Sequence, residues 1–195
     1  MIFLSAGIPS PKPIEGREFF GKGNVPAIRE SVMAFTRVCM EYHIPFCFGG
    51  QPAISPLVYE IAKNFGAEFA SNVKIYQSAF FKGKTPKEVS YFKNIEWTKI
   101  VDDKDWRPNV ASMREIMLGQ KLQCAVFIGG MDGIIDEAKM FHRLHPDAEM
   151  ISVPNTGGAT SVLKDRTKLD FITLPNNYAY VSSFKKYLLK YKNNG

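Results

Sequence analysis

The sequence predicts a doubly wound α/β fold, with a mostly parallel sheet and helices on both of its faces. The 195 residues show three features that point to it: short apolar runs, glycines at the ends of several runs, and helical patterns between them. Parallel strands need long crossover connections, and helices supply them. At this length, with 45% hydrophobic residues, we expect one domain over residues 1–195.

The expected strands are short apolar runs bounded by turn residues. Most of them read as fully buried, because polar and apolar side chains do not alternate along them. They are residues 1–6, 44–50, 73–81, 94–100, 124–130 and 148–159, the last including a glycine turn. The polar stretch at 81–94 is expected to be an excursion on the surface.

The clearest expected helix runs from Pro26 to Tyr42. Apolar residues keep a helical period along it, Asn24 can cap its start, and Pro26 suits the first turn. Further helices are predicted at 55–65, 109–120, 133–144 and 179–191. In the third of these five, Met113, Ile116 and Met117 are expected to pack inward.

Composition limits the classes of function. Cys39, Cys47 and Cys124 lie in apolar stretches without metal-binding spacing, so we expect buried free thiols and no metal. The first residues resemble neither a signal peptide nor a membrane span, so we expect a soluble, cytoplasmic protein with no membrane partner. A net charge of +6 favours anionic ligands, but the lysines are dispersed, which argues against a nucleic-acid surface.

Ligands of doubly wound sheets bind beyond the carboxyl ends of the strands. Four segments should meet there: residues 5–9, 48–53, 128–133 and 154–160. Glycine lets backbone approach a ligand closely, and a helix that follows offers free N–H groups to a phosphate. A nucleotide therefore fits this edge of the sheet. The segments match neither the dinucleotide-binding GxGxxG pattern nor the P-loop, which disfavours an ordinary dehydrogenase or ATPase.

Two charged residues are candidates at the same edge. Glu137 either accepts hydrogen bonds from ribose hydroxyls, acts at the sugar's anomeric carbon, or is a solvated residue of a first helical turn. Arg114 is either a phosphate clamp or a surface arginine paired with an acid. Trp97 and Trp106 flank a loop and belong either to the core or to a lid, while Ser5 lacks the G-x-S-x-G setting of a serine nucleophile.

The Arg114 and Glu137 segments carry a resemblance. "SMRE", a strand, and then "GGMDGIIDE" resemble the SLOG superfamily, a Rossmann-like group that includes the DNA-processing protein DprA and the Lonely Guy phosphoribohydrolases. The latter carry an arginine on the preceding helix and then PGGxGTxxE. Arg114 and Glu137 match the arginine and the glutamate, and Gly129, Gly130 and Gly133 match the glycines.

The sequence also departs from that motif. Ile128 replaces the proline, Ile134 replaces the threonine, and one extra residue precedes Gly133. Together with "FLSAGIPSP", "PFCFGGQPAISPLV", "IYQSAFF" and "VPNTGGAT", these features look like the SLOG branch found beside TIR and sirtuin-like domains in anti-phage systems such as Thoeris. That resemblance covers nearly the whole chain.

The resemblance to this branch implies a sensor of NAD-derived nucleotides, such as ADP-ribose or its cyclic isomers, without a further cofactor. Arg114 and backbone amides would take the phosphates, and Glu137 a ribose. The expected binding residues are Ser5, Ala6, Gly7, Gly49, Gly50, Gln77, Arg114, Gly129, Gly130, Met131, Gly133, Glu137, Thr156, Gly157 and Gly158. A homo-oligomer and a separate effector protein are the expected partners.

Two alternatives stay open. An enzyme could cleave the N-glycosidic bond of a nucleoside monophosphate or an NAD-like substrate, with Glu137 and Arg114 as its catalytic pair. A weaker alternative is single-stranded DNA binding, as in DprA, which only the basic charge balance supports.

Overall fold

A computed structural model describes residues 1–66 and 71–192 and contains a seven-stranded sheet in which every strand pairing is parallel. The strands are β1 (Ile2–Gly7), β2 (Phe46–Phe48), β3 (Val73–Ser78), β4 (Ile95–Thr98), β5 (Cys124–Gly129), β6 (Glu149–Val153) and β7 (Ile172–Thr173). The α-helices are α1 (Val25–Glu41), α2 (Ser55–Ala62), α4 (Trp106–Leu118), α5 (Asp132–Leu144), α6 (Leu163–Thr167) and α7 (Tyr180–Leu188). Short 3-10 turns lie at Lys63–Phe65, Ala79–Phe81, Lys87–Tyr91, Pro154–Thr156, Gly158–Val162 and Leu189–Tyr191.

The strand order is β4-β3-β2-β1-β5-β6-β7, which confirms the doubly wound topology. From β1 the chain builds outward through β2 to β4, then returns to the other side of β1 with β5 and continues to β7. The direction therefore reverses between β1 and β5, whose ladder runs from the Ile2–Cys124 pair to the Gly7–Gly129 pair. Such a switch point leaves a crevice beyond the carboxyl ends of the two strands.

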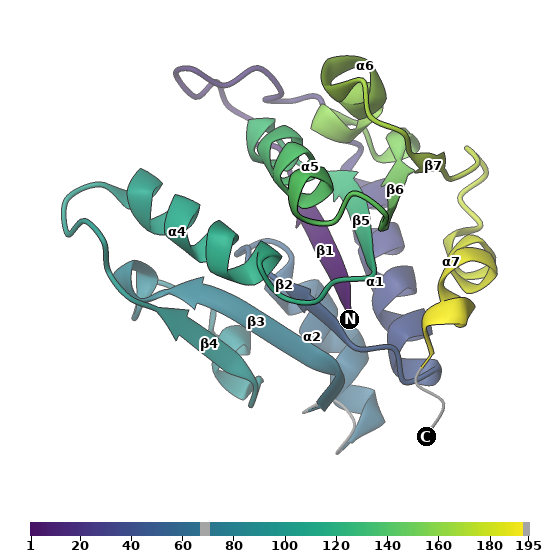
Figure 1. The fold of residues 1–195 in the computed structure, drawn as a ribbon, viewed down its shortest axis with the longest axis horizontal. Coiled ribbons are helices and arrows are strands. Elements are labelled where there is room, and N and C mark those ends of the chain that lie inside the picture. Colours follow the sequence, from purple (N-terminus) through teal and green to yellow (C-terminus); the bar gives the residue numbers. More distant parts are fainter. Residues whose placement is uncertain (67–70, 193–195) are drawn as a thin grey trace.

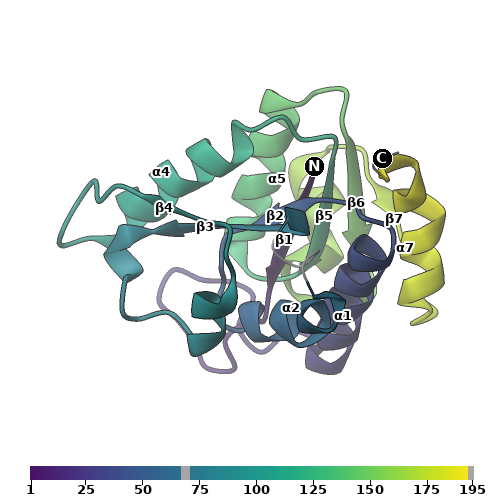
Figure 2. The same ribbon diagram turned by 90° about the horizontal axis from the view of Figure 1, so that it is seen from below.

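Helices cover both faces of the sheet (Figure 1). Figure 2 shows α4 and α5 on one side and α1 and α2 on the other. Alternate residues of β1 supply the two cores: Ile2 and Leu4 pack with α1, α2 and α7, and Phe3 packs with α4 and α5. Because both faces are covered, the central strands β1, β2 and β5 are apolar at every position except Ser5, a pattern typical of parallel strands.

The first long helix begins as expected. Asn24 caps α1, and its side-chain oxygen accepts a hydrogen bond from the amide of Ala27 at 3.2 Å. The three cysteines are free and buried, as predicted. Burial raises the pKa of both Cys47 and Cys124 to about 12, so these thiols stay protonated and unreactive near neutral pH.

Three local expectations were wrong. The strand predicted to reach residue 81 ends at Ser78, because the Ser78 hydroxyl accepts the amide of Phe80 and starts a 3-10 turn. Ile116 is 37% exposed, since it lies one helical position away from the inward-facing Met117. The polar stretch at 81–94 is also not wholly a surface feature, because Val89 and Phe92 enter the core.

The sequence reading also missed α6 and β7, which are short and lack a clear period. In the part of the chain that the structure describes, no helix is long and apolar enough to cross a membrane.

Candidate functional site

The principal pocket lies beyond the carboxyl ends of β1 and β2 and has a volume of about 490 Å³. Ser5, Ala6 and Gly7 of β1 and Gly49 and Gly50 after β2 border one part of it. Helices α4 and α5 wall it, and residues of the loop between β1 and α1 complete it. Gly130 and Met131, which follow β5, also line the pocket, so the cavity includes the crevice between β1 and β5 that the switch point creates.

Three side chains form a hydrogen-bonded cluster in this pocket, which we call the Arg114–Glu137–Ser5 cluster. The Nε of Arg114 donates to Oε1 of Glu137 at 2.7 Å, and the hydroxyl of Ser5 donates to Oε2 at 2.5 Å. The side chains of Glu137 and Arg114 are only 14% and 23% exposed. A buried carboxylate is costly unless it is paired and hydrogen-bonded, and this one is held on both oxygens.

Arg114 has further hydrogen-bond donors that no described residue accepts from. Its Nε serves Glu137, while neither terminal nitrogen has a hydrogen-bond partner among the described residues. A guanidinium group carries five donors in a planar fork that suits phosphate and carboxylate oxygens. The glutamate therefore orients the arginine and leaves its outer edge free for an anionic ligand.

Gly133 makes room for this arrangement. A Cβ atom at Gly133 would lie 2.3 Å from Nη2 of Arg114, so any side chain there would displace the guanidinium. Gly133 lies in α5 and is not among the residues with positive φ. Its lack of a side chain thus serves the close approach of Arg114 and not the backbone conformation.

The glycine pair at the end of β5 is engaged within the protein. Gly129 and Gly130 have φ values of 62° and 71°, which glycine adopts readily. The Gly129 amide donates to the hydroxyl of Thr156 at 2.9 Å, and the Gly130 amide donates to the carbonyl of Gly7 at 2.7 Å. These two amides, expected to bind phosphate, already have acceptors, so an anion must find its donors elsewhere in the pocket.

The glycine turn after β6 lies outside the lining of the pocket. Thr156, Gly157, Gly158 and Gly129 are expected binding residues that do not line the cavity. The amide of Gly158 donates to the carbonyl of Lys22 at 2.8 Å, which ties the β1–α1 loop to this turn. The other expected residues do line the pocket: Ser5, Ala6, Gly7, Gly49, Gly50, Gln77, Arg114, Gly130, Met131, Gly133 and Glu137.

Arg17 and Lys84 line the pocket without having been expected there, and Trp106, expected either in the core or in a lid, lines it as well. Arg17, from the loop between β1 and α1, lies 3.7 Å from the carboxylate of Asp132 and 5.8 Å from the ring centroid of Trp106. Trp106 begins α4 and is 38% exposed, and Lys84 adds a further positive charge to the lining. Trp106 therefore belongs to the pocket, whereas Trp97 lies in β4 and does not line it.

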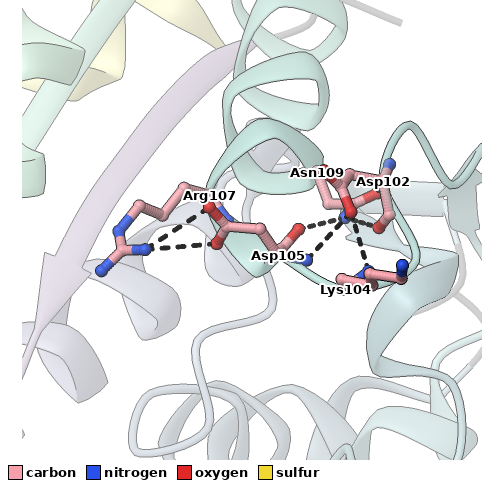
Figure 3. Close-up of polar contacts among 5 residues, drawn as sticks. All are labelled: Asp102, Lys104, Asp105, Arg107 and Asn109. Atoms are coloured by element: carbon pink, nitrogen blue, oxygen red, sulfur yellow. Dashed lines mark hydrogen bonds and ion pairs between the residues drawn. The ribbon is translucent and has the colours of Figure 1, made fainter.

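Figure 3 shows the polar contacts of the loop that leads into α4, the helix that begins at Trp106. Asn109 is fully buried; its side-chain oxygen accepts the amide of Val101 at 2.8 Å, and its nitrogen donates to the carbonyl of Asp105 at 2.7 Å. Asp105 caps the helix by accepting the amide of Arg107 at 3.0 Å. Asn109 thus holds the backbone of the loop that leads into Trp106, the first residue of α4.

Replacing Asn109 by alanine is expected to lower the free energy of unfolding by about 1 to 3 kcal/mol, because the buried backbone groups that it serves lose their partner. Chemical denaturation of the variant measures this loss. The exposed Lys99, in the same loop, provides the control, and Lys99→Ala should leave the unfolding midpoint unchanged. Equal stability of Asn109→Ala and the unmodified protein would contradict the assigned role.

In the described part of the chain, no group of three histidine, cysteine, aspartate or glutamate side chains is placed to hold a metal ion. None of the three histidines lines the pocket. The Nε2 atom of His145 contacts the carbonyl oxygen of Leu118 at 2.7 Å.

The fold and the pocket define the class: a Rossmann-like α/β protein with a pocket at its topological switch point. The model of the SLOG cluster3 family matches residues 18–188, and the chain belongs to that family. Membership indicates a nucleotide-related role, either binding or glycosidase-like chemistry. No curated protein matched the sequence.

Proposed function

We propose that the pocket binds an NAD-derived nucleotide of the ADP-ribose or cyclic ADP-ribose type and that the protein is a sensor of this ligand. The observation that carries the proposal is the Arg114–Glu137–Ser5 cluster, which joins a partly free guanidinium to a carboxylate inside a largely apolar pocket. A phosphate matches the first group, and a ribose hydroxyl, which is a donor, matches the second.

We assign the phosphates to basic side chains rather than to the backbone amides at the start of α5. Asp132 occupies the first turn of that helix, and its carboxylate repels an anion there. Arg114, Arg17 and Lys84 line the same pocket and supply positive charge from three different segments. Several cations converging on one cavity suit a ligand with more than one phosphate.

Signalling in anti-phage defence is the biological role we propose for this sensor, because the sequence resembles the SLOG branch associated with TIR and sirtuin-like domains. A nucleotide signal needs an effector, so a ligand-dependent homo-oligomer and a separate effector protein are the proposed partners. The ligand changes the oligomeric state only if it binds one assembly state more tightly than the other.

Isothermal titration calorimetry with ADP-ribose, cyclic ADP-ribose and NAD tests the proposal. We expect saturable binding of at least one of the first two, with affinity that falls as salt is raised because charged groups meet the phosphates. Absence of heat with all three ligands over a broad concentration range would contradict it. Sedimentation of the same mixtures reports whether the ligand changes the oligomeric state.

Hydrolysis of an N-glycosidic bond is the second candidate, and the buried Glu137 favours it. In this reaction water adds to the anomeric carbon, the bond to the base breaks, and the base leaves with a proton. Glu137 would stabilise the positive charge that develops on the sugar, and Arg114 would hold the phosphate. Chromatography of AMP and NAD incubated with protein detects the free base, and turnover that survives Glu137→Gln would exclude this role.

A further inference from the structure

One polar side chain in the pocket lacks the partner that its burial demands. Gln77, near the end of β3, is 5% exposed, and its Oε1 has no hydrogen-bond partner. Gln51 lines the same pocket but differs, since its Oε1 accepts the amide of Ala53 at 2.7 Å. A buried amide without a partner costs free energy in the empty protein, so an external function is the natural reason to keep it.

The backbone gives this amide its space. A Cβ atom at Gly50 would lie 2.5 Å from Oε1 of Gln77, and Gly50 has a φ of 59°. Rotation about the last side-chain bond of Gln77 presents either an acceptor or a donor to its surroundings. Gly50, which lines the pocket as Gln77 does, therefore leaves room for the amide oxygen where a side chain would clash with it.

The lining of the pocket also contains apolar and aromatic side chains. Phe48, Phe81, Met113 and Met117 line the pocket together with Trp106, which is 38% exposed. Phosphate and ribose gain nothing from such walls, whereas a planar heterocycle buries its faces against them and keeps hydrogen-bonding groups at its edge. A glutamine amide matches adenine in particular, because it can accept from the exocyclic amine and donate to a ring nitrogen.

We infer that Gln77 and Trp106 form the base-recognition subsite of the pocket, with Gln77 hydrogen-bonding the edge of an adenine and Trp106 packing on its face. This inference rests on the proposed function, which places phosphate and ribose at the Arg114–Glu137–Ser5 cluster. It assigns the ligand to the adenine nucleotides and makes Gln77 the residue that reads the base.

The test compares AMP with ribose 5-phosphate, two probes that differ only in the base. By calorimetry, the unmodified protein should bind AMP at least tenfold more tightly. Gln77→Met keeps the length of the side chain and should reduce that ratio about fivefold while leaving the affinity for ribose 5-phosphate unchanged. Gln120→Met, a glutamine that does not line the pocket, is the matched control and should leave both affinities unchanged.

The two proposals fail in different ways. If Gln77→Met lowers both affinities equally, or leaves the ratio as it was, the base subsite is wrong while the pocket assignment stands. If the unmodified protein binds neither probe, the base subsite is overturned, and the titration with ADP-ribose decides the pocket assignment separately. Thermal unfolding shows whether the variant is folded. Gln77→Met removes an unpaired buried acceptor and should not lower the melting temperature.

Tryptophan fluorescence gives an independent measurement on the unmodified chain. The protein has two tryptophans, and only Trp106 lines the pocket. AMP should quench the emission and ribose 5-phosphate should not, and Trp106→Phe should abolish the change. Equal quenching by the two probes, or quenching that persists in Trp106→Phe, would overturn the packing of the base on Trp106.

Discussion

Replacing Arg114 by alanine is expected to weaken the binding of ADP-ribose by more than tenfold, which corresponds to more than about 1.4 kcal/mol. Two losses combine. The phosphate loses the free edge of the guanidinium, and Glu137 is left 14% exposed without its cation, so its negative charge repels the ligand. Calorimetry with the purified variant gives the ratio of dissociation constants directly.

Two further variants separate local geometry from overall charge. Arg114→Lys keeps the positive charge but loses the planar fork, so it should recover only part of the affinity. Arg143→Ala removes an exposed positive charge from the last turn of α5 and should bind ADP-ribose as the unmodified protein does. Unchanged affinity in Arg114→Ala would count decisively against this site.

Replacing Gly133 by alanine is expected to weaken the same ligand about tenfold without destabilising the protein. The new Cβ would lie 2.3 Å from Nη2 of Arg114 and would force the guanidinium out of its position. The helix itself gains, because alanine is favoured over glycine in a helix by up to about 1 kcal/mol. A melting temperature that is kept or raised, together with weaker binding, is the expected result.

Lys139→Ala supplies the control for this experiment. It lies on the same helix, is exposed and does not line the pocket, so its affinity should not change. Full affinity in Gly133→Ala would contradict the proposed link between the glycine, the orientation of Arg114 and the phosphate.

Strand-to-helix periodicity was enough to predict the topology and the edge where the pocket lies. It did not show whether each glycine borders the pocket or another segment of the protein. The glycines at 157 and 158 follow a strand just as Gly49 and Gly50 do, yet they hold backbone against the loop at Lys22. A sequence shows that a turn needs glycine, but not whether a ligand or another loop lies against it.

The side chains that complete the pocket come from segments without a recognisable pattern. Arg17 lies in an irregular loop, and Trp106 begins α4 directly after the turn whose backbone Asn109 hydrogen-bonds. The inward face of α4 was similarly not fixed by spacing: Ile116 and Met117 lie three and four residues after Met113, and packing buries the two methionines. Such choices depend on tertiary contacts that local spacing does not encode.

Native mass spectrometry of the unmodified protein with ADP-ribose, cyclic ADP-ribose isomers, NAD and AMP tests the central claim most directly, because it reads the bound mass and any conversion together. We predict a retained, chemically unaltered ADP-ribose-type nucleotide that is lost in Arg114→Ala. Release of a free base, with a ribose phosphate or ADP-ribose as the second product, would contradict the sensor and make the protein an N-glycoside hydrolase.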